Sequence, residues 1–441
     1  MTTRRLQQLA MQASTTTRRD FVQGLARSLF GLSIGSFALG NSALGSTRPL
    51  LARPIAVPQQ KARQVIYLFL RGGMSHVDTL DPKPGSKTQG PVEALTTRAD
   101  GVQLGQYFPK LAQQADKVCI VSSMSSKQGA HPQAQYLMRT SFEKRGTIQH
   151  PSLGAWVNHS QGRQNPTLPG HVILGGGADM PTAGFFPPSL AALPIGDPST
   201  GLQNATRPRP ISAGRFDHRL ELLAEMNREF HAAHEERDAQ AHDEAYAAAV
   251  RLMRSEDLAA FDIDRESTSM REVYGDTPFG AGCLLARRLV EHGVRFVEVV
   301  SDGWDTHADN FDRLSDLTPA IDQGLSALLA DLDGRGLLQE TLVVLATEFG
   351  RTPDIDQDQG RNHYPKAFSC LLAGGGIRGG QRYGRTDEEG REVIDAPVSI
   401  QDFNATIAYA AGVATDEVVT SPSGRPFKVA DKGYPLTDLF A

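Results

Sequence analysis

Apolar residues gather in short runs along this chain, and these runs predict buried strands. Each run holds four or more apolar residues, is rich in β-branched or aromatic side chains, and is followed by polar residues or glycines. Runs of this length and composition are typical of strands that are buried on both faces of a sheet. The predicted strands are 64–70, 117–123, 171–177, 294–300, 341–347 and 366–374.

Segments with helical spacing of apolar residues lie between the later runs. The first is 279–293, which ends at Gly293, a residue that often terminates helices. The next is 312–336, where Pro319 predicts a break, and the last is 401–413. Strands that alternate with helices predict an α/β fold, with a mostly parallel sheet covered by helices on both faces.

Residues 215–262 differ in composition from the rest of the chain. They are rich in Ala, Glu and Arg, with apolar residues at helical spacing, which predicts two or more helices outside the core. We interpret 215–270 as a helical insertion in a single domain that spans 64–441. His231 and His234 are three residues apart here, but no strand end brings partners to them, so we interpret them as solvated.

The N-terminal residues 1–45 resemble a twin-arginine export signal. Arg18 and Arg19 precede a short apolar stretch that glycines and a serine interrupt. A membrane span needs about 20 apolar residues, so we expect no permanent membrane anchor. We expect recognition by the twin-arginine export machinery and a periplasmic or secreted protein, with 46–63 as a linker. The alternative is an amphipathic N-terminal helix.

Composition and charge exclude some classes of function. With 40% hydrophobic residues the chain can bury a sizeable core. The formal net charge of -5 gives no basic footprint, which argues against nucleic acid as a partner. The three cysteines are scattered without a CxxC pair, which favours buried thiols over disulfides or a thiolate zinc site. They are Cys119, Cys283 and Cys370.

Polar residues suited to metal binding follow several of the predicted strands. The stretch GWDTHADNF carries Asp305 and His307, Glu348 follows another strand, and His363 precedes a third. Ligands of parallel α/β sheets bind beyond the carboxyl ends of the strands. A mixed set of carboxylates and imidazoles suits zinc, manganese or iron better than calcium or magnesium. The alternatives are a catalytic pair, or a polar turn in which the histidines hydrogen-bond to carbonyl groups.

Two other motifs carry less weight. Ser75 and His76 resemble a nucleophile beside a base, but adjacent residues of an extended chain point apart and no G-x-S-x-G elbow is present. Residues 374–379 fit G-x-G-x-x-G after a strand, but no helix pattern follows to hold a phosphate. We therefore expect neither a serine triad nor dinucleotide binding.

Several motifs together resemble one family. The chain from residue 60 to residue 415 is similar to the exported bacterial family called domain of unknown function 1501. The family resembles distantly the alkaline phosphatase and sulfatase superfamily, which implies an alkaline-phosphatase-like fold with a metal centre at strand ends. The motifs, in order, are LRGGMSHVDTLDPKP, YGDTPFGAGCLLARRLVEHGVRFVEV, GWDTHADNF, TLVVLATEFGRTP, GRNHYPKAFSCLLAGGGIRGG and YGRTDEEG.

The resemblance also implies roles for particular residues. It implies one metal centre formed by Asp305, His307, Glu348 and His363. The chain departs from the superfamily after its first predicted strand, where Arg71 stands in place of a metal-binding Asp. Asp78, Asp81 and His76 are the residues available to replace a missing ligand. The helix predicted at 131–141 places His131 near the position of the superfamily nucleophile.

Two hypotheses follow from these residues. The first is an exported hydrolase of phosphate or sulfate esters that depends on a divalent metal, zinc above all, with manganese and iron as alternatives. The metal would polarise the ester and activate water, Arg351 would neutralise the small anionic ester substrate, and His76 would act as acid or base. The second is an exported binding or assembly protein with an inactive site on the same scaffold.

Overall fold

The computed structural model describes residues 61–176, 180, 182–207, 210–233 and 237–441, with side chains between 229 and 242 not described. All of these except Met180 belong to one compact unit. The expected export signal and most of the linker lie outside the described residues. So do the side chains of His231 and His234. No helix in the described ranges combines the length and the apolar character that a membrane crossing requires.

A nine-stranded sheet forms the centre of the unit. Its strands are β1 (Gln64–Leu70), β4 (Val118–Ser125), β5 (His171–Leu174), β6 (Leu193–Ile195), β7 (Phe296–Ser301), β8 (Thr341–Ala346), β11 (Phe368–Gly374), β12 (Gln381–Tyr383) and β15 (Val398–Ser399). The order is β12-β4-β11-β8-β1-β7-β5-β6, and β15 also pairs with β4. Only β11 runs antiparallel to its neighbours within this sheet. The predicted mostly parallel sheet is confirmed.

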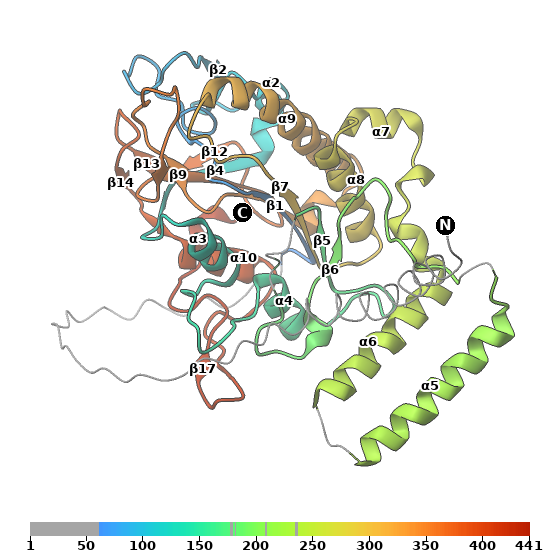
Figure 1. Cartoon of the computed structure of the whole chain (residues 1–441). Coiled ribbons are helices and arrows are strands. Elements are labelled where there is room, and N and C mark those ends of the chain that lie inside the picture. Colours follow the sequence, from blue (N-terminus) through green and yellow to red (C-terminus); the bar gives the residue numbers. More distant parts are fainter. Residues whose placement is uncertain (1–60, 177–179, 181, 208–209, 234–236) are drawn as a thin grey trace, which may run out of the picture. The chain divides into compact units, whose positions relative to one another are not determined.

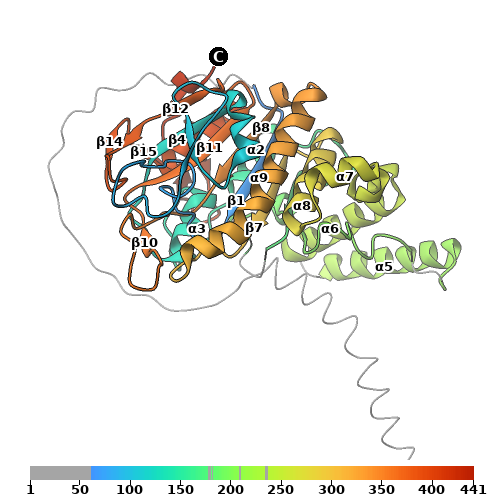
Figure 2. The same cartoon turned by 90° about the horizontal axis from the view of Figure 1, so that it is seen from above.

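Helices cover both faces of this sheet, as predicted (Figures 1 and 2). Alternate residues of β1 show why, because successive side chains of a strand point to opposite faces. Ile66 and Leu68 pack in one buried apolar cluster, whereas Val65 and Tyr67 pack in another. The first cluster includes residues of α8 (Pro278–Glu291) and α9 (Asn310–Gly334), and the second includes residues of α3 (His131–Thr140), α4 (Leu153–Gln161) and α10 (Ile400–Ala410).

The break expected at Pro319 is absent, and this prediction was wrong. The helix α9 continues from Asn310 to Gly334 with Pro319 inside it. Pro319 is exposed, so the carbonyl that loses its helical hydrogen bond lies on the solvent side, where water can replace the lost donor. The buried side of the helix, with Leu314 and Ile321, keeps its packing against the core.

The segment predicted to be helical forms two long helices, α5 (Ala213–Ala233) and α6 (Arg237–Arg254), followed by α7 (Thr268–Tyr274). The remaining elements are short. They are α2 (Pro109–Ala112) and the strand pairs β2 (Ala94–Thr96) with β3 (Gln103–Gly105), β9 (Gly350–Arg351) with β10 (His363–Tyr364), β13 (Arg385–Thr386) with β14 (Val393–Asp395), and β16 (Val419–Thr420) with β17 (Pro426–Phe427). Single 3-10 turns lie at Ala115–Lys117, Pro188–Leu190, Glu256–Phe261, Ile263–Arg265, Leu338–Glu340 and Thr437–Leu439.

The three cysteines are buried and free, as their apolar surroundings predicted. Burial raises the pKa of the Cys119 thiol to about 12, so it stays protonated at neutral pH.

Candidate metal centre

Four side chains from distant parts of the chain meet beyond the carboxyl end of β7. His131 begins α3, Asp305 and His307 lie in the loop after β7, and His363 begins β10. Oδ1 of Asp305 lies 3.0 Å from Nε2 of His307 and 3.3 Å from Nε2 of His363. Its Oδ2 lies 3.4 Å from Nε2 of His131. Three imidazole Nε2 atoms thus surround one carboxylate.

The outer nitrogen of each of these three histidines is held by an oxygen atom. Because a carbonyl or carboxylate oxygen only accepts hydrogen bonds, Nδ1 of each ring carries the proton. In a neutral imidazole, Nε2 is then left with a lone pair that points to the centre of the group. The acceptors are Oε1 of Glu348 for His131 (2.9 Å), Oδ1 of Asn362 for His307 (3.0 Å) and the carbonyl oxygen of Gly129 for His363 (2.7 Å).

The spacing of the inner atoms fits the coordination shell of a divalent ion. Zinc binds imidazole nitrogen at about 2.0–2.1 Å, so neighbouring ligand atoms around it stand about 3.0 Å apart at right angles and about 3.4 Å apart in a tetrahedron. Nε2 of His307 lies 2.9 Å from Nε2 of His363, and the contacts to Asp305 span 3.0–3.4 Å. One ligand atom each from His131, Asp305 and His363 lies within 4.8 Å of the others. The donors present therefore suit zinc, manganese or iron.

Two glycines allow the loops of the site to approach one another. At Gly72 the backbone has φ +128°, and a Cβ there would stand 2.5 Å from the backbone nitrogen of Asp305. At Gly360 a Cβ would stand 1.8 Å from the carbonyl oxygen of His307. Any side chain at either position would push Asp305 or His307 away from the site, because real Cβ contacts are never this short.

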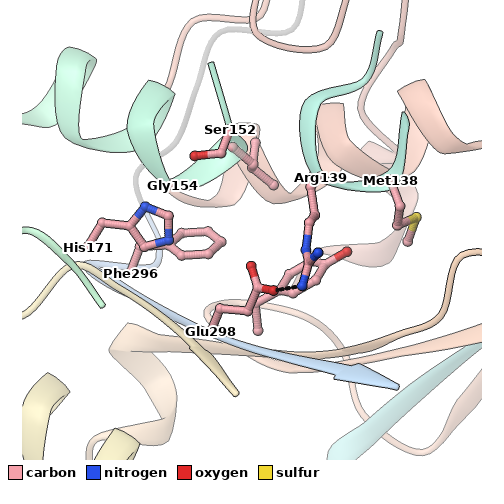
Figure 3. Close-up of a pocket in the computed structure, with 9 residues that line it drawn as sticks. Met138, Arg139, Ser152, Gly154, His171, Phe296 and Glu298 are labelled. Carbon is pink, nitrogen blue, oxygen red and sulfur yellow. Dashed lines mark hydrogen bonds and ion pairs between the residues drawn. The ribbon is translucent and has the colours of Figure 1, made fainter. Parts of the chain in front are cut away.

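The helix α3, which carries His131 at its first turn, is held to the sheet near its other end. The Arg139 guanidinium donates to the Glu298 carboxylate of β7 and lies over the Phe69 ring, 4.3 Å from its centroid. Both charged side chains are buried (Figure 3). Breaking a buried ion pair of this kind leaves one charge without compensation, which strongly favours the native position of α3. This pair therefore fixes the C-terminal half of α3 against β7 and β1.

The family to which the chain belongs can now be stated. A family model described as "Protein of unknown function (DUF1501)" matches residues 62–440. This chain belongs to that family. No curated protein matches it. Membership therefore assigns no activity, and the residues themselves must indicate one.

Solved structures with similar folds include members of several enzyme classes. The lipoteichoic acid synthase LtaP from Listeria monocytogenes is 10% identical, with 81% of this chain and 74% of that chain covered and a TM-score of 0.38. The PsFucS1 sulfatase from Pseudoalteromonas sp. is 14% identical (86% and 72% covered, TM-score 0.35). The alkaline phosphatase from the Antarctic bacterium TAB5 is 11% identical (73% and 95% covered, TM-score 0.31). Likenesses at this level say nothing about the site of this DUF1501 chain.

Arg351 contacts the cluster through Asp305, whereas we expected it to contact an anionic substrate. Its guanidinium is fully buried and donates to Asp305 Oδ1 at 2.5 Å, to the carbonyls of Gly72 and Gly73, and to the carbonyl of Arg361 at 3.1 Å. Burial alone raises the pKa of Asp305, but the hydrogen bond and charge of Arg351 outweigh it and hold that pKa at about 2. Arg351 therefore keeps Asp305 anionic, and four of its N–H donors are directed at acceptors of the protein itself.

Glu348, which the resemblance placed among the metal ligands, lies behind His131. Its side chain is fully buried, and its Oε1 accepts the Nδ1–H of His131. This hydrogen bond raises the pKa of His131 above its ordinary value. The carboxylate thus touches the outer side of the imidazole instead of the inner side where the Asp305 carboxylate lies.

His76, the expected acid or base, is separate from the cluster. Its ring is fully buried, and Nε2 donates to the carbonyl oxygen of Gly390 at 2.8 Å. Burial lowers the pKa of His76, because a buried imidazole loses the hydration that favours its charged form. Among the described residues, no hydrogen bond joins it to Asp305 or to the three clustered histidines. A buried ring in this position has no access to a substrate at the cluster.

The other residues considered as replacement ligands are committed to ion pairs. Asp78 pairs with Arg361 at 2.7 Å, and both side chains are fully buried. Asp81 pairs with Lys83 at 3.1 Å. The additional residue beside Asp305 is instead His131, through its Nε2. The sequence marked it only as a residue near a nucleophile position, and the Nδ1 acceptor on Glu348 that turns its Nε2 inward left no local signal in the sequence.

Proposed function

We propose that this chain is an exported metal-dependent hydrolase of phosphate or sulfate esters. One observation carries the proposal: three imidazoles, each fixed through Nδ1, direct Nε2 toward an Asp305 carboxylate that Arg351 keeps ionised. The Arg351 guanidinium offsets the charge of Asp305, and a cation among the three lone pairs would offset their mutual repulsion. A divalent ion is the cation that this donor set prefers, with zinc first and manganese or iron as alternatives.

The proposed chemistry uses a centre that is open on one side. When bound, a divalent ion supplies Lewis-acid polarisation of an ester oxygen and makes water acidic enough to act as a nucleophile at neutral pH. Asp305 and His307 are each 46% exposed, whereas His131 is 23% exposed, so an ester approaches from the side of the loop after β7. Asp305 contributes a fixed negative charge, and the histidines contribute neutral nitrogens.

Water is the nucleophile in this proposal because, in the part of the chain that the structure describes, no hydroxyl or thiol group contacts the cluster. His131 stands where the resemblance would place a nucleophile, and its ring faces Asp305 instead. Ser75 is buried, and its hydroxyl donates to Asp78 at 2.6 Å. Hydrolysis by water needs no covalent enzyme intermediate, and a single metal centre suffices for it.

Export belongs to the proposal as well. Twin-arginine substrates cross the membrane folded, often with a cofactor already bound, so the export machinery would be the first partner of the loaded chain. The periplasm or the exterior would then be the place of action. The small anionic ester would be the second partner.

Turnover by the loaded chain tests the proposal. Protein loaded with zinc, manganese or iron is expected to hydrolyse an aryl phosphate or an aryl sulfate, and a chelator is expected to abolish the rate. His363→Ala and His307→Ala should remove the activity, whereas His218→Ala, on the exposed surface of α5, should keep it. If no loaded form turns over either ester class, the hydrolase proposal is overturned.

A second function, an exported binding or assembly protein, has one observation in its favour. Within the described residues, the three histidines and Asp305 make no hydrogen bond with a hydroxyl or thiol group, and all three cysteines are buried. This reading predicts a metal bound in stoichiometric amount with no turnover of either ester class. The same loading experiment therefore separates the two functions.

A further inference from the structure

The Glu348 carboxylate, directly after β8, receives three hydrogen bonds on a single oxygen. Its Oε1 accepts from the backbone nitrogen of Gly72 at 2.9 Å, from Nδ1 of His131 at 2.9 Å and from Nε2 of Gln135 at 3.1 Å. Oε2 is buried and has no hydrogen-bond partner among the described residues. The three donors come from the loop after β1 and from two successive turns of α3.

This arrangement is costly unless positive charge lies close to the carboxylate. A fully buried carboxylate loses its hydration, and neutral donors offset only part of that loss. Arg351 points its guanidinium to Asp305 and to backbone carbonyls, so the donor that faces Glu348 with the most positive character is the Nδ1–H of His131. A cation on Nε2 of that ring would increase this positive character and strengthen the hydrogen bond.

We propose that Glu348 is a positioning residue that acts on the metal through His131 and is not itself a ligand. It stabilises the His131 tautomer whose Nε2 points to the centre. Its Oε1 also accepts hydrogen bonds from both the loop after β1 and α3, and so connects these two segments. Metal binding and the docking of α3 then stabilise each other. This inference rests on the proposed metal centre, and it assigns Glu348 a different role from the direct ligation that the family resemblance implied.

Geometry favours the indirect role over direct ligation. Asp305 lies 3.0–3.4 Å from the Nε2 atoms of the three histidines, whereas within the described residues no hydrogen bond or ion pair joins Glu348 to Asp305, His307 or His363. Its hydrogen-bonded oxygen is turned to the outer nitrogen of His131, on the opposite side of the ring from Asp305. Carboxylates in this position behind a metal-bound histidine fix ring orientation and raise ligand basicity.

Cobalt(II) binding to the purified full chain tests the inference. Glu348→Gln keeps the size of the side chain but removes its charge, and we expect about 10–100-fold weaker Co(II) binding than in the unsubstituted chain. The visible absorption bands of bound Co(II) should keep their positions and intensities, because the ligand set is unchanged. His131→Ala is the reference for a lost ligand, since its bands should shift. Glu340→Gln, at an acid that is 49% exposed, is the matched control and should change neither readout.

Each outcome bears on the inference. Unchanged affinity in Glu348→Gln overturns it, and bands altered as in His131→Ala overturn it in favour of direct ligation. Should Glu348→Gln fail to fold, Gln135→Leu removes one of the three donors instead. We expect Gln135→Leu to weaken Co(II) binding less than Glu348→Gln would, without altering the absorption bands. Unchanged Co(II) affinity in this variant again overturns the inference. If the unsubstituted chain binds no Co(II), zinc or manganese, the proposed function fails before Glu348 is tested.

Discussion

Nε2 of His363 lies 2.9 Å from Nε2 of His307, although the two residues are 56 positions apart in the chain. Each ring donates its Nδ1–H to an oxygen, so the two inner nitrogens face each other as acceptors. Such a contact is unfavourable unless a positively charged species lies between the rings. The Asp305 carboxylate lies beside both nitrogens, and under the proposed function the positive species is a divalent metal ion.

The loop after β1 gives the first prediction. Gly72→Ala would place a Cβ 2.5 Å from the backbone nitrogen of Asp305, at a backbone φ of +128°. Gly85→Ala has a similar positive φ of +84° but open space around the added Cβ, so it is the matched control. We expect Gly85→Ala to cost about 1–2 kcal/mol of unfolding free energy. Gly72→Ala should cost more and also weaken metal binding, and equal costs measured by urea unfolding would contradict the close approach.

Arg351 gives the second prediction. Arg351→Met removes the donor that holds Asp305 and leaves buried carbonyls without a partner, which should cost about 3 kcal/mol or more. Metal affinity should fall together with stability, because Asp305 loses its fixed position. The control Arg391→Met removes partly exposed pairs with Asp354 and Glu389 and should cost about 1 kcal/mol each or less. An Arg351→Met chain that retains full metal affinity would show that Asp305 is held by other contacts.

A buried histidine gives a prediction of pH dependence. Burial and the charge of Arg139 lower the pKa of His171 to about 3, whereas an unfolded histidine has a pKa of about 6.5. Between these two pH values, His171 binds a proton in the unfolded chain but not in the folded chain. Stability due to this group is therefore fully present above pH 6.5 and falls by about 1.4 kcal/mol per pH unit as the pH is lowered toward 3.

Unfolding free energies at pH 7 and pH 5 measure this slope. His171→Leu should lose about 2 kcal/mol less than the unsubstituted chain over that interval. His218→Leu, on the exposed surface of α5, should behave as the unsubstituted chain does. The same pH slope in His171→Leu would mean that His171 binds a proton in the folded state.

The fold could be predicted from the sequence because its strands are buried on both faces. Such strands leave continuous apolar runs, and the run at 64–70 coincides with β1. The run at 294–300 became β7 at Phe296–Ser301, a shift within the usual uncertainty of element ends. Pro319 misled the prediction because its exposure, which makes it tolerable inside α9, is a property of the folded chain.

The site was less accessible to sequence reasoning. Asp305, His307 and His363 stood out because they flank predicted strands, and the structure brings them together. Hydrogen bonds between segments more than 200 residues apart determine the orientations of Glu348 and His131. The group that accepts the Nδ1–H of His363 is the backbone carbonyl of Gly129, and any residue type could supply such a carbonyl.

The metal content of the purified, folded chain tests the central claim most directly. We predict one divalent ion per chain in protein purified without chelator, lost from His363→Ala and from Asp305→Ala while both variants keep their secondary structure. Thermal unfolding of the unsubstituted chain should shift to higher temperature when the metal is restored after chelation. A chain that carries no stoichiometric metal, and that unfolds at the same temperature after Asp305→Ala or His363→Ala, would contradict the account.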